Sequence, residues 1–410
     1  MFILSFLLLL PGCGKNKAVY RAYDEARAAA LADPGPAPGS WKPDVKVQLS
    51  GKLVDELISV VLAERGEFTE EIKVSAATLK PQVVVESLVV GESEACKTCL
   101  AIDMDLSGTL DWSAGVLGSG EVDYTARVAL DASFEAKKGP KRWKVFAKPR
   151  DVRSVRLSVS GWSGAVKNVA EAPLKKWLDE NFVSKIQPIE VAAFGTESIP
   201  LRAMRVRPVR KGLAIEMLSS VPNPGRVAVP DAQIKGGFIA WVSSDSVVRY
   251  AAAEAFEMGP QDYDIVGEPR GLSVDKQRFV LDLRLWKVGG AGWWRDYSVL
   301  GKLGVRKKAI KLLADDVQEG EKSKGAAMAD PLYFLGEGIV ARKMEEAFAV
   351  SLPNIIQQKV GGMATLTRIG GVRGVGDVLE VNGRIEFIEP SSGGRGKSKS
   401  KKRPGGKQRP

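Results

Sequence analysis

Residues 45–64 (VKVQLSGKLVDELISVVLAE) and residues 238–258 (FIAWVSSDSVVRYAAAEAFEM) carry the same pattern. Each segment starts with a short strand-like run, 45–49 or 238–242, and continues into apolar residues at helical spacing. The spacing predicts helices over 51–64 and 244–258, and Ser244 or Asp245 is a plausible N-cap of the second helix. A strand–helix unit therefore begins each of two similar halves of the chain.

The remainder of each half repeats one order of elements: alternating strands, a long helix and final strands. In the first half we expect strands over 82–90, 100–106, 121–135, 143–148 and 152–160, a helix over 164–186, and strands over 201–209 and 212–218. In the second half we expect strands over 278–285, 297–305 and 308–317, a helix over 335–358, and strands over 363–369 and 378–387. Alternating strands bury one sheet face and solvate the other, as in antiparallel meanders. Each sheet must then curl around its long helix to cover the helix.

The length of the folded region predicts two domains. Residues 41–390 exceed the size at which a single hydrophobic core usually stops growing. We place the domains at 41–222 and 223–390. The predicted class is α+β, with two tandem domains that each wrap a strongly curved antiparallel sheet around a long helix.

This order of elements resembles the tubular lipid-binding (TULIP) superfamily, which includes proteins similar to bactericidal/permeability-increasing protein. The paired helices 51–64 with 164–186, and 244–258 with 335–358, carry the resemblance. It implies a lipid-filled groove between helix and sheet. The apolar residues that would face an acyl-chain ligand are Leu174, Leu178, Phe182, Met344, Phe348 and Leu352. Alternatively, each of these residues belongs to an ordinary packed core and contacts no ligand.

The N-terminus resembles a bacterial lipoprotein signal. Its sequence MFILSFLLLLPGC is an apolar run too short to span a bilayer, and it ends in Gly12-Cys13. The resemblance implies removal of residues 1–12 and lipidation of Cys13, with acyl chains such as palmitate. Residues 13–40 would then be a lipidated tether with a Pro/Gly linker. We expect an envelope lipoprotein that faces the periplasm, at the outer membrane. The alternatives are an uncleaved signal or a buried hydrophobic start.

Two further cysteines, Cys96 and Cys99, lie between the strand-like runs 82–90 and 100–106. An oxidising compartment favours a disulfide that pins the hairpin loop. A redox-active CxxC is the alternative, although that chemistry prefers a helix N-terminus. The chain has no histidine, which argues against zinc at two thiols alone.

The absence of histidine also excludes the Ser-His-Asp triad, the Cys-His pair and the HExxH site. The remaining acidic candidates, Asp103 and Asp105, alternate with apolar residues and predict a solvated strand face. The cluster Gly370–Gly376 lacks the dinucleotide-binding spacing and predicts a turn between strands. We therefore expect no enzyme activity, no cofactor and no metal.

Most of the net charge of +11 lies at the C-terminus. Residues 391–410 hold eight basic and no acidic residues, so the rest of the chain carries only +3. This composition predicts a disordered tail that binds an anionic polymer or membrane surface, or else only solubilises the chain. Nucleic acid is an unlikely partner. The leading functional prediction is lipid binding or transfer in the grooves, and the alternative is a non-enzymatic envelope scaffold whose basic tail binds partners.

Overall fold

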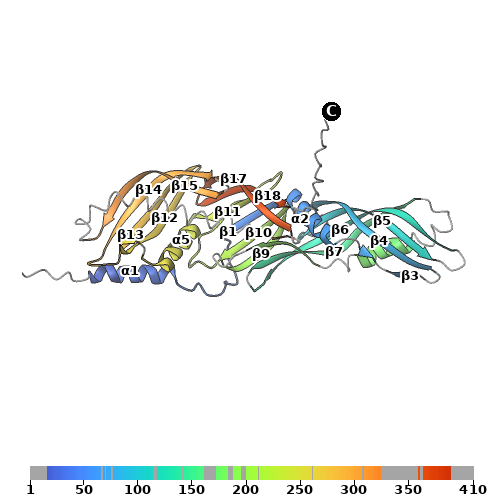
Figure 1. Cartoon of the computed structure of the whole chain (residues 1–410), viewed down its shortest axis with the longest axis horizontal. Helices are drawn as coiled ribbons and strands as arrows, with labels where there is room; N and C mark the ends of the chain where they lie inside the picture. Colours follow the sequence, from blue (N-terminus) through green and yellow to red (C-terminus); the bar gives the residue numbers. More distant parts are fainter. Residues whose placement is uncertain are drawn as a thin grey trace, which may run out of the picture.

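The computed structural model describes residues 16–65, 68–69, 71–74, 77–113, 118–140, 142–160, 172–182, 188–194, 200–210, 212–260, 262–306, 309–324, 359–360 and 363–388. The molecule is elongated, and three open antiparallel sheets follow one another along its length (Figure 1). Strands dominate and helices are fewer, so the predicted α+β class holds for the described chain. The boundaries 41–222 and 223–390 stay predictions.

The central sheet is built around β1 (Val45–Ser50) and β11 (Phe238–Ser243), the strands of the repeated unit. They pair antiparallel, with Val47 opposite Ala240. The sheet order is β16-β17-β18-β11-β1-β10-β9, with these bounds: β9 Leu201–Val209, β10 Gly212–Ser219, β16 Lys359–Val360, β17 Met363–Val375 and β18 Val378–Ile388. The last strands of each half therefore flank that half's first strand. The central sheet combines both halves, so the expectation of a separate sheet for each half is wrong.

The helices α2 (Gly51–Arg65) and α5 (Ser244–Met258) follow β1 and β11 directly, as predicted. The Ser50 N–H donates to the Gly237 carbonyl at 3.0 Å, and the Ser243 N–H donates to the Asp44 carbonyl at 2.9 Å. These equivalent bonds fix the point where each strand turns into its helix. The N-cap of α5 is Ser243, one residue before the predicted Ser244. Ser243 ends the strand with an extended backbone and Ser244 is already helical, so the helix starts one residue earlier than a cap at Ser244 would allow.

The other two sheets lie at the two ends of the molecule (Figure 1). One has the order β2-β4-β5-β6-β7-β8, and β3 also pairs with β4. Its strands are β2 Phe68–Thr69, β3 Ile72–Val74, β4 Ala77–Glu92, β5 Cys99–Ser113, β6 Ser119–Lys138, β7 Trp143–Val159 and β8 Ile189–Phe194. The other contains β12 Ile265–Asp275, β13 Arg278–Lys287, β14 Trp293–Arg306 and β15 Ala309–Lys322 in sequential order.

Several strands differ from their predicted form. The runs 143–148 and 152–160 form one strand, β7, because irregular pairing beside Leu130 of β6 absorbs the break in alternation. The short β8 and the whole of β12 were not predicted. Most of the cluster Gly370–Gly376 belongs to β17, and only Gly376 with Asp377 forms the turn to β18.

The faces of β4 also differ from prediction. The alternation of Val83, Val85 and Val89 places all three on one face, but a register shift lies between Val85 and Ser87. A one-residue shift moves every later side chain to the opposite face. Val83 is consequently buried, whereas Val89 is 58% exposed.

A row of polar side chains crosses the central sheet on the face away from the apolar core. The strand registers align Arg205 of β9, Glu216 of β10, Lys46 of β1, Trp241 of β11, Glu380 of β18 and Arg373 of β17. Glu216 accepts from Arg205 at 2.5 Å, and Glu380 accepts from the Trp241 indole at 3.0 Å and from Arg373 at 2.7 Å. Opposite charges therefore alternate across strands from both halves, which is favourable cross-strand pairing.

The segment 221–236, here called the strap, covers this row. Its Asp231 lies 2.9 Å from Lys46 Nζ, and Lys46 also donates to the Val229 carbonyl at 2.8 Å. Arg207 of β9 holds Asp231 through two hydrogen bonds of 2.7 and 2.8 Å. These bonds from Arg207 lower the pKa of Asp231 to about 2, although burial opposes the shift. Asp231 is thus ionised at neutral pH and compensates the buried Lys46.

The helix α1 (Lys17–Ala30) lies within the segment 13–40 that was expected to be a tether, but it is docked on the folded body. Its Val19 and Tyr23 are buried against Phe256 of α5, Val266 of β12 and Trp286 of β13. The Tyr23 ring lies edge-on to Phe256 and Trp286, at centroid distances of 5.6 and 5.8 Å. A stripe at helical spacing, Val19, Tyr23, Ala26 and Ala30, faces the body and explains the docking.

Lys46 offers a test of the polar row. We expect Lys46→Ala to destabilise the protein by about 1–3 kcal/mol, because it removes one of the two cations that contact Asp231 and leaves the Val229 carbonyl without the Lys46 donor. Lys302→Ala is the matched control, since Lys302 is exposed and lies 3.6 Å from Asp315, where a loss of about 0–1 kcal/mol is usual. Urea unfolding would measure both. Equal losses would contradict a structural role for the row.

Candidate lipid-binding interior

The inner face of the β4–β8 sheet is a continuous apolar surface. On β5 the side chains Leu100, Ile102, Met104, Leu106 and Leu110 are all buried, and alternate residues point outward. Neighbouring strands continue the surface with Val83, Tyr124, Ala126, Val128, Leu130 and Val145. This face forms because strict alternation along antiparallel strands directs every second side chain inward.

A short stretch of helix lies against this face. Residues 172–177 are α-helical and lead into a π-helix, Leu178–Phe182. Leu174, Trp177 and Leu178 are buried in the same core as the inner face of the sheet. A π-helical turn widens the backbone, is rare, and occurs frequently at functional sites. The predicted helix 164–186 is described only over this stretch.

The predicted ligand-facing residues fall into two groups. Leu174 and Leu178 lie in the interior and are 0% exposed, so each is packed core in this structure. The side chain of Phe182, together with Met344, Phe348 and Leu352, lies outside the described residues, as do Cys13 and the basic tail. A lipid-contacting role for all six apolar residues stays a prediction.

One polar contact lies within this interior. The Tyr124 hydroxyl donates to the Gln82 carbonyl at 3.0 Å, and burial raises the pKa of Tyr124, so the phenol stays neutral. Gly108 permits this arrangement, because a Cβ at that position would lie 1.8 Å from the same Gln82 oxygen. Tyr124 of β6 therefore reaches across β5 to β4 through a contact that only glycine at position 108 allows.

The helix α2 forms another wall, and one of its acidic residues is half-buried there. Asp55 accepts a hydrogen bond from the Val90 N–H of β4 at 2.6 Å. Burial raises the pKa of Asp55 to about 6, and the nearby Glu56 adds to the shift, whereas the bond from Val90 opposes it. This carboxyl therefore titrates near the lower end of the physiological range.

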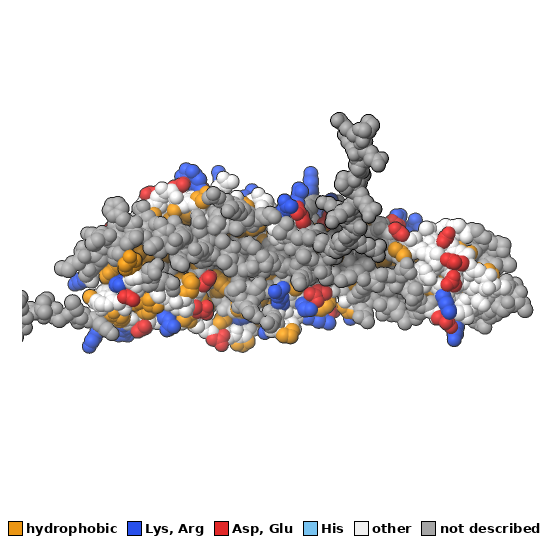
Figure 2. All heavy atoms as spheres, in the orientation of Figure 1, with side chains coloured by type: hydrophobic (Ala, Val, Ile, Leu, Met, Phe, Trp, Pro, Cys, Tyr) orange, Lys and Arg blue, Asp and Glu red, His pale blue; other side chains and the backbone are white. Residues whose placement is uncertain are grey.

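The outer face of the sheet is solvated, as predicted for Asp103 and Asp105. Asp105 pairs with Arg127 at 2.8 Å, and Asp103 pairs with Arg153 at 3.2 Å. Hydrogen bonds from Arg127 lower the pKa of Asp105, so it stays an ordinary surface carboxylate. Figure 2 shows acidic and basic side chains intermixed over the described part of this end, which is typical of a solvated surface.

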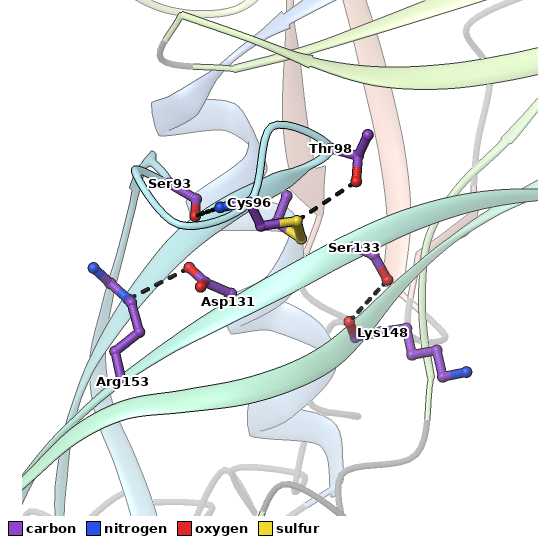
Figure 3. Close-up of a disulfide and its surroundings, with 8 residues drawn as sticks. Ser93, Cys96, Thr98, Asp131, Ser133, Lys148 and Arg153 are labelled. Atoms are coloured by element: carbon purple, nitrogen blue, oxygen red, sulfur yellow. Dashed lines mark hydrogen bonds and ion pairs between the residues drawn. A yellow bond between two sulfur atoms is a disulfide. The ribbon is translucent and has the colours of Figure 1, made fainter.

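The disulfide Cys96–Cys99 lies in the loop between β4 and β5, as predicted (Figure 3). The Cys96 N–H donates to the Ser93 hydroxyl at 3.0 Å, and the Cys99 N–H donates to the Cys96 carbonyl at 3.1 Å. The pair lies in a turn rather than at a helix N-terminus, which favours a structural role over thiol exchange.

This interior is lined by apolar side chains, and the buried residues of the helical stretch fill it. Within the described ranges, no group of three or more acidic or cysteine side chains could hold a metal ion. No helix in the described part of the chain is long and apolar enough to span a membrane.

The sequence analysis did not predict the cluster around Tyr23 or the polar row. The charged residues of the row can be seen in the sequence, but the sequence does not show which residues on other strands pair with them.

Comparisons with known proteins find solved structures that are similar only at a low level. No protein-family model and no curated protein matches the sequence. Among solved structures, a lipopolysaccharide binding protein is similar at 12% identity and a TM-score of 0.39, over 85% of this chain and 100% of that chain. P47 from Clostridium botulinum A2 is similar at 10% identity and a TM-score of 0.40, over 83% and 97%. P47 of Clostridium botulinum E1 is similar at 8% identity and 0.41, over 84% and 100%.

Asp55 predicts a specific pH dependence. Its pKa is higher in the folded chain than in the unfolded chain, so its contribution to stability is greatest below about pH 4 and falls as pH rises through about 6. Asp55→Asn should flatten that part of the pH profile, whereas Asp103→Asn, a change at an exposed carboxylate, should leave it unchanged. Urea unfolding at pH 4, 5, 6 and 7 would measure the slopes. An unchanged slope in Asp55→Asn would show that other groups cause the pH dependence of stability between pH 4 and 7.

Proposed function

We propose that this protein is an envelope lipoprotein, anchored through Cys13, that binds lipid by its acyl chains. The ligand would lie between the inner face of the β4–β8 sheet and the helical stretch 172–182. The observation that carries the proposal is the unbroken apolar face of this sheet, opposed by a helix whose inward residues are equally apolar. Such a surface recognises hydrocarbon without any catalytic group.

The dimensions of this surface suit an acyl chain. Buried side chains on β5 extend from Leu100 to Leu110, a rise of about 34 Å at roughly 3.4 Å per residue. One leaflet of a bilayer has a hydrocarbon depth of about 15 Å, half of the usual core thickness. The inner face is therefore long enough to hold a complete acyl chain along the strands.

Ligand entry requires the helical stretch to move. Leu174 and Leu178 occupy the space that an acyl chain would take, since both are fully buried. The π-helical turn at Leu178–Phe182 makes this stretch a reasonable place for such a movement, because its hydrogen bonding already departs from that of an α-helix. Each buried methylene of the ligand contributes about 0.8 kcal/mol, which offsets the displacement.

The proposal assigns binding rather than catalysis. The half-buried carboxyl of Asp55 has a hydrogen-bond partner in Val90, which accounts for it structurally. The neutral phenol of Tyr124 is likewise bonded to the Gln82 carbonyl.

Lipid occupancy can be tested with the full chain. We expect native mass spectrometry of the full-length Cys13→Ser variant, which cannot be lipidated and is purified from a bacterial periplasm without detergent, to show a near-stoichiometric acyl lipid. Leu178→Trp should reduce that occupancy at least tenfold, because the indole fills the interior. Val89→Trp is the matched control, since Val89 is 58% exposed on the outer face. Circular dichroism would confirm that both variants fold.

The opposite results have a clear meaning. A bare protein mass, together with no uptake of added fluorescent phospholipid, would overturn lipid binding and favour the envelope scaffold. If Leu178→Trp unfolds, Leu178→Ala provides the second test, because enlarging the interior should raise the occupancy or lengthen the bound chain.

A further inference from the structure

We infer that the tip of the β12–β15 sheet faces the membrane that holds the lipid anchor, and that the β4–β8 interior is held away from it. The tip consists of the β13–β14 turn (288–292), the described residues 259–260 and 262–264 of the α5–β12 connection, and the start of α1. The inference rests on lipidation of Cys13, which is part of the proposed function. It adds an orientation that neither the sequence nor the fold alone provides.

The start of α1 is bonded directly to the β13–β14 turn. The Asn16 N–H donates to the Ala291 carbonyl at 2.8 Å. The Tyr20 hydroxyl donates to the carbonyls of Val288 at 2.9 Å and Gly290 at 3.1 Å. Gly292 lies so close to Tyr20 that a Cβ there would be 2.9 Å from the ring. The chain at Asn16 is thus fixed to this turn.

The remainder of α1 keeps that attachment in place. Val19 is 4% exposed and Tyr23 is 9% exposed, within the cluster formed by Phe256, Val266 and Trp286. Burying aliphatic and aromatic side chains of this size contributes about 1.5–3 kcal/mol each. The helix is therefore part of the folded body and does not act as a flexible spacer.

The distance from this fixed point to the anchor is short. Cys13 precedes Asn16 by three residues, and a fully extended chain covers at most about 3.6 Å per residue, or about 11 Å in all. Acyl chains on Cys13 must lie in the bilayer. The β13–β14 turn consequently lies within about 11 Å of the anchored cysteine, at the level of the headgroups.

This turn is at the end of the sheet farthest from the centre of the molecule. The opposite end of the same hairpins contacts the central sheet, where the Gly374 N–H donates to the Lys276 carbonyl. β13 runs between the two ends, and its length is about 30 Å. In Figure 1 the β4–β8 sheet extends from the other side of the central sheet. Anchorage at the tip therefore directs that interior away from the anchoring membrane.

The composition of the tip fits a membrane interface. Tyr263 is 59% exposed, and Met258 at the end of α5 is 52% exposed. Tyrosine is enriched where proteins meet the headgroup region. Tyr263 and Asp264 have φ values of 62° and 55°, and the loop is held by Lys287, which bonds the Tyr263 carbonyl and pairs with Asp264 at 3.2 Å. A fixed loop thus presents the aromatic ring outward.

Photocrosslinking tests this orientation in the full chain. A p-benzoylphenylalanine would replace Tyr263 or, as the control, Val89, because these positions are 59% and 58% exposed on opposite halves. The lipidated protein would be reconstituted on vesicles of phosphatidylethanolamine and phosphatidylglycerol. We expect phospholipid adducts at position 263 to exceed those at 89 by at least tenfold. Equal adducts, or more at position 89, would overturn the orientation.

A second set of variants separates orientation from anchorage. Tyr23→Ala should release α1, so the protein stays lipidated and membrane-bound but loses the preference for crosslinks at position 263. Arg21→Ala, a change at a residue that is 82% exposed on the same helix, should keep the preference. Retention of the preference in Tyr23→Ala would contradict control by the docked helix.

The mass of the N-terminal peptide distinguishes the two proposals. An unlipidated Cys13 would refute the anchorage and the orientation together, while lipid bound in the interior would still be detected by native mass spectrometry. A lipidated Cys13 without crosslinks at position 263 would refute the orientation alone.

Discussion

The antiparallel pairing of β1 with β11 is the interaction on which the rest of the structure depends. These strands come from opposite halves of the chain, and each has its own half's last two strands on its other side. Each strand also leads directly into a helix that packs beneath a neighbouring sheet. Separating this pair would divide the central sheet and expose the apolar core that runs from one end sheet to the other.

The central sheet has two faces with different roles. Its inner face carries Val47, Ala240 and their neighbours into the common core, whereas the outer face carries the polar row beneath the strap. Buried charges are tolerated on the outer face because each has a partner of opposite sign, as Lys46 has Asp231. Apolar burial supplies the driving force for folding, and the polar row pairs opposite charges across neighbouring strands.

The central sheet determines how the proposed anchor and the proposed lipid-binding interior lie relative to each other. A rigid central sheet separates the β4–β8 interior from the end that carries α1, so anchorage and ligand binding would occur at opposite ends. A lipid carried in the interior would then be exchanged with something other than the anchoring bilayer. Aromatic packing of Tyr23 would connect the two proposed functions, because it makes α1 part of the body.

The sequence by itself determined the local elements: the strand–helix units at 45–64 and 238–258, the alternating faces of β5 and β13, and the loop disulfide. These depend on side-chain periods and on residues near one another in the chain. Only the tertiary structure decided that both halves share one sheet, that Val89 faces outward and that α1 docks. Sheet partners, register shifts and docking depend on contacts between distant residues, which periodicity does not encode.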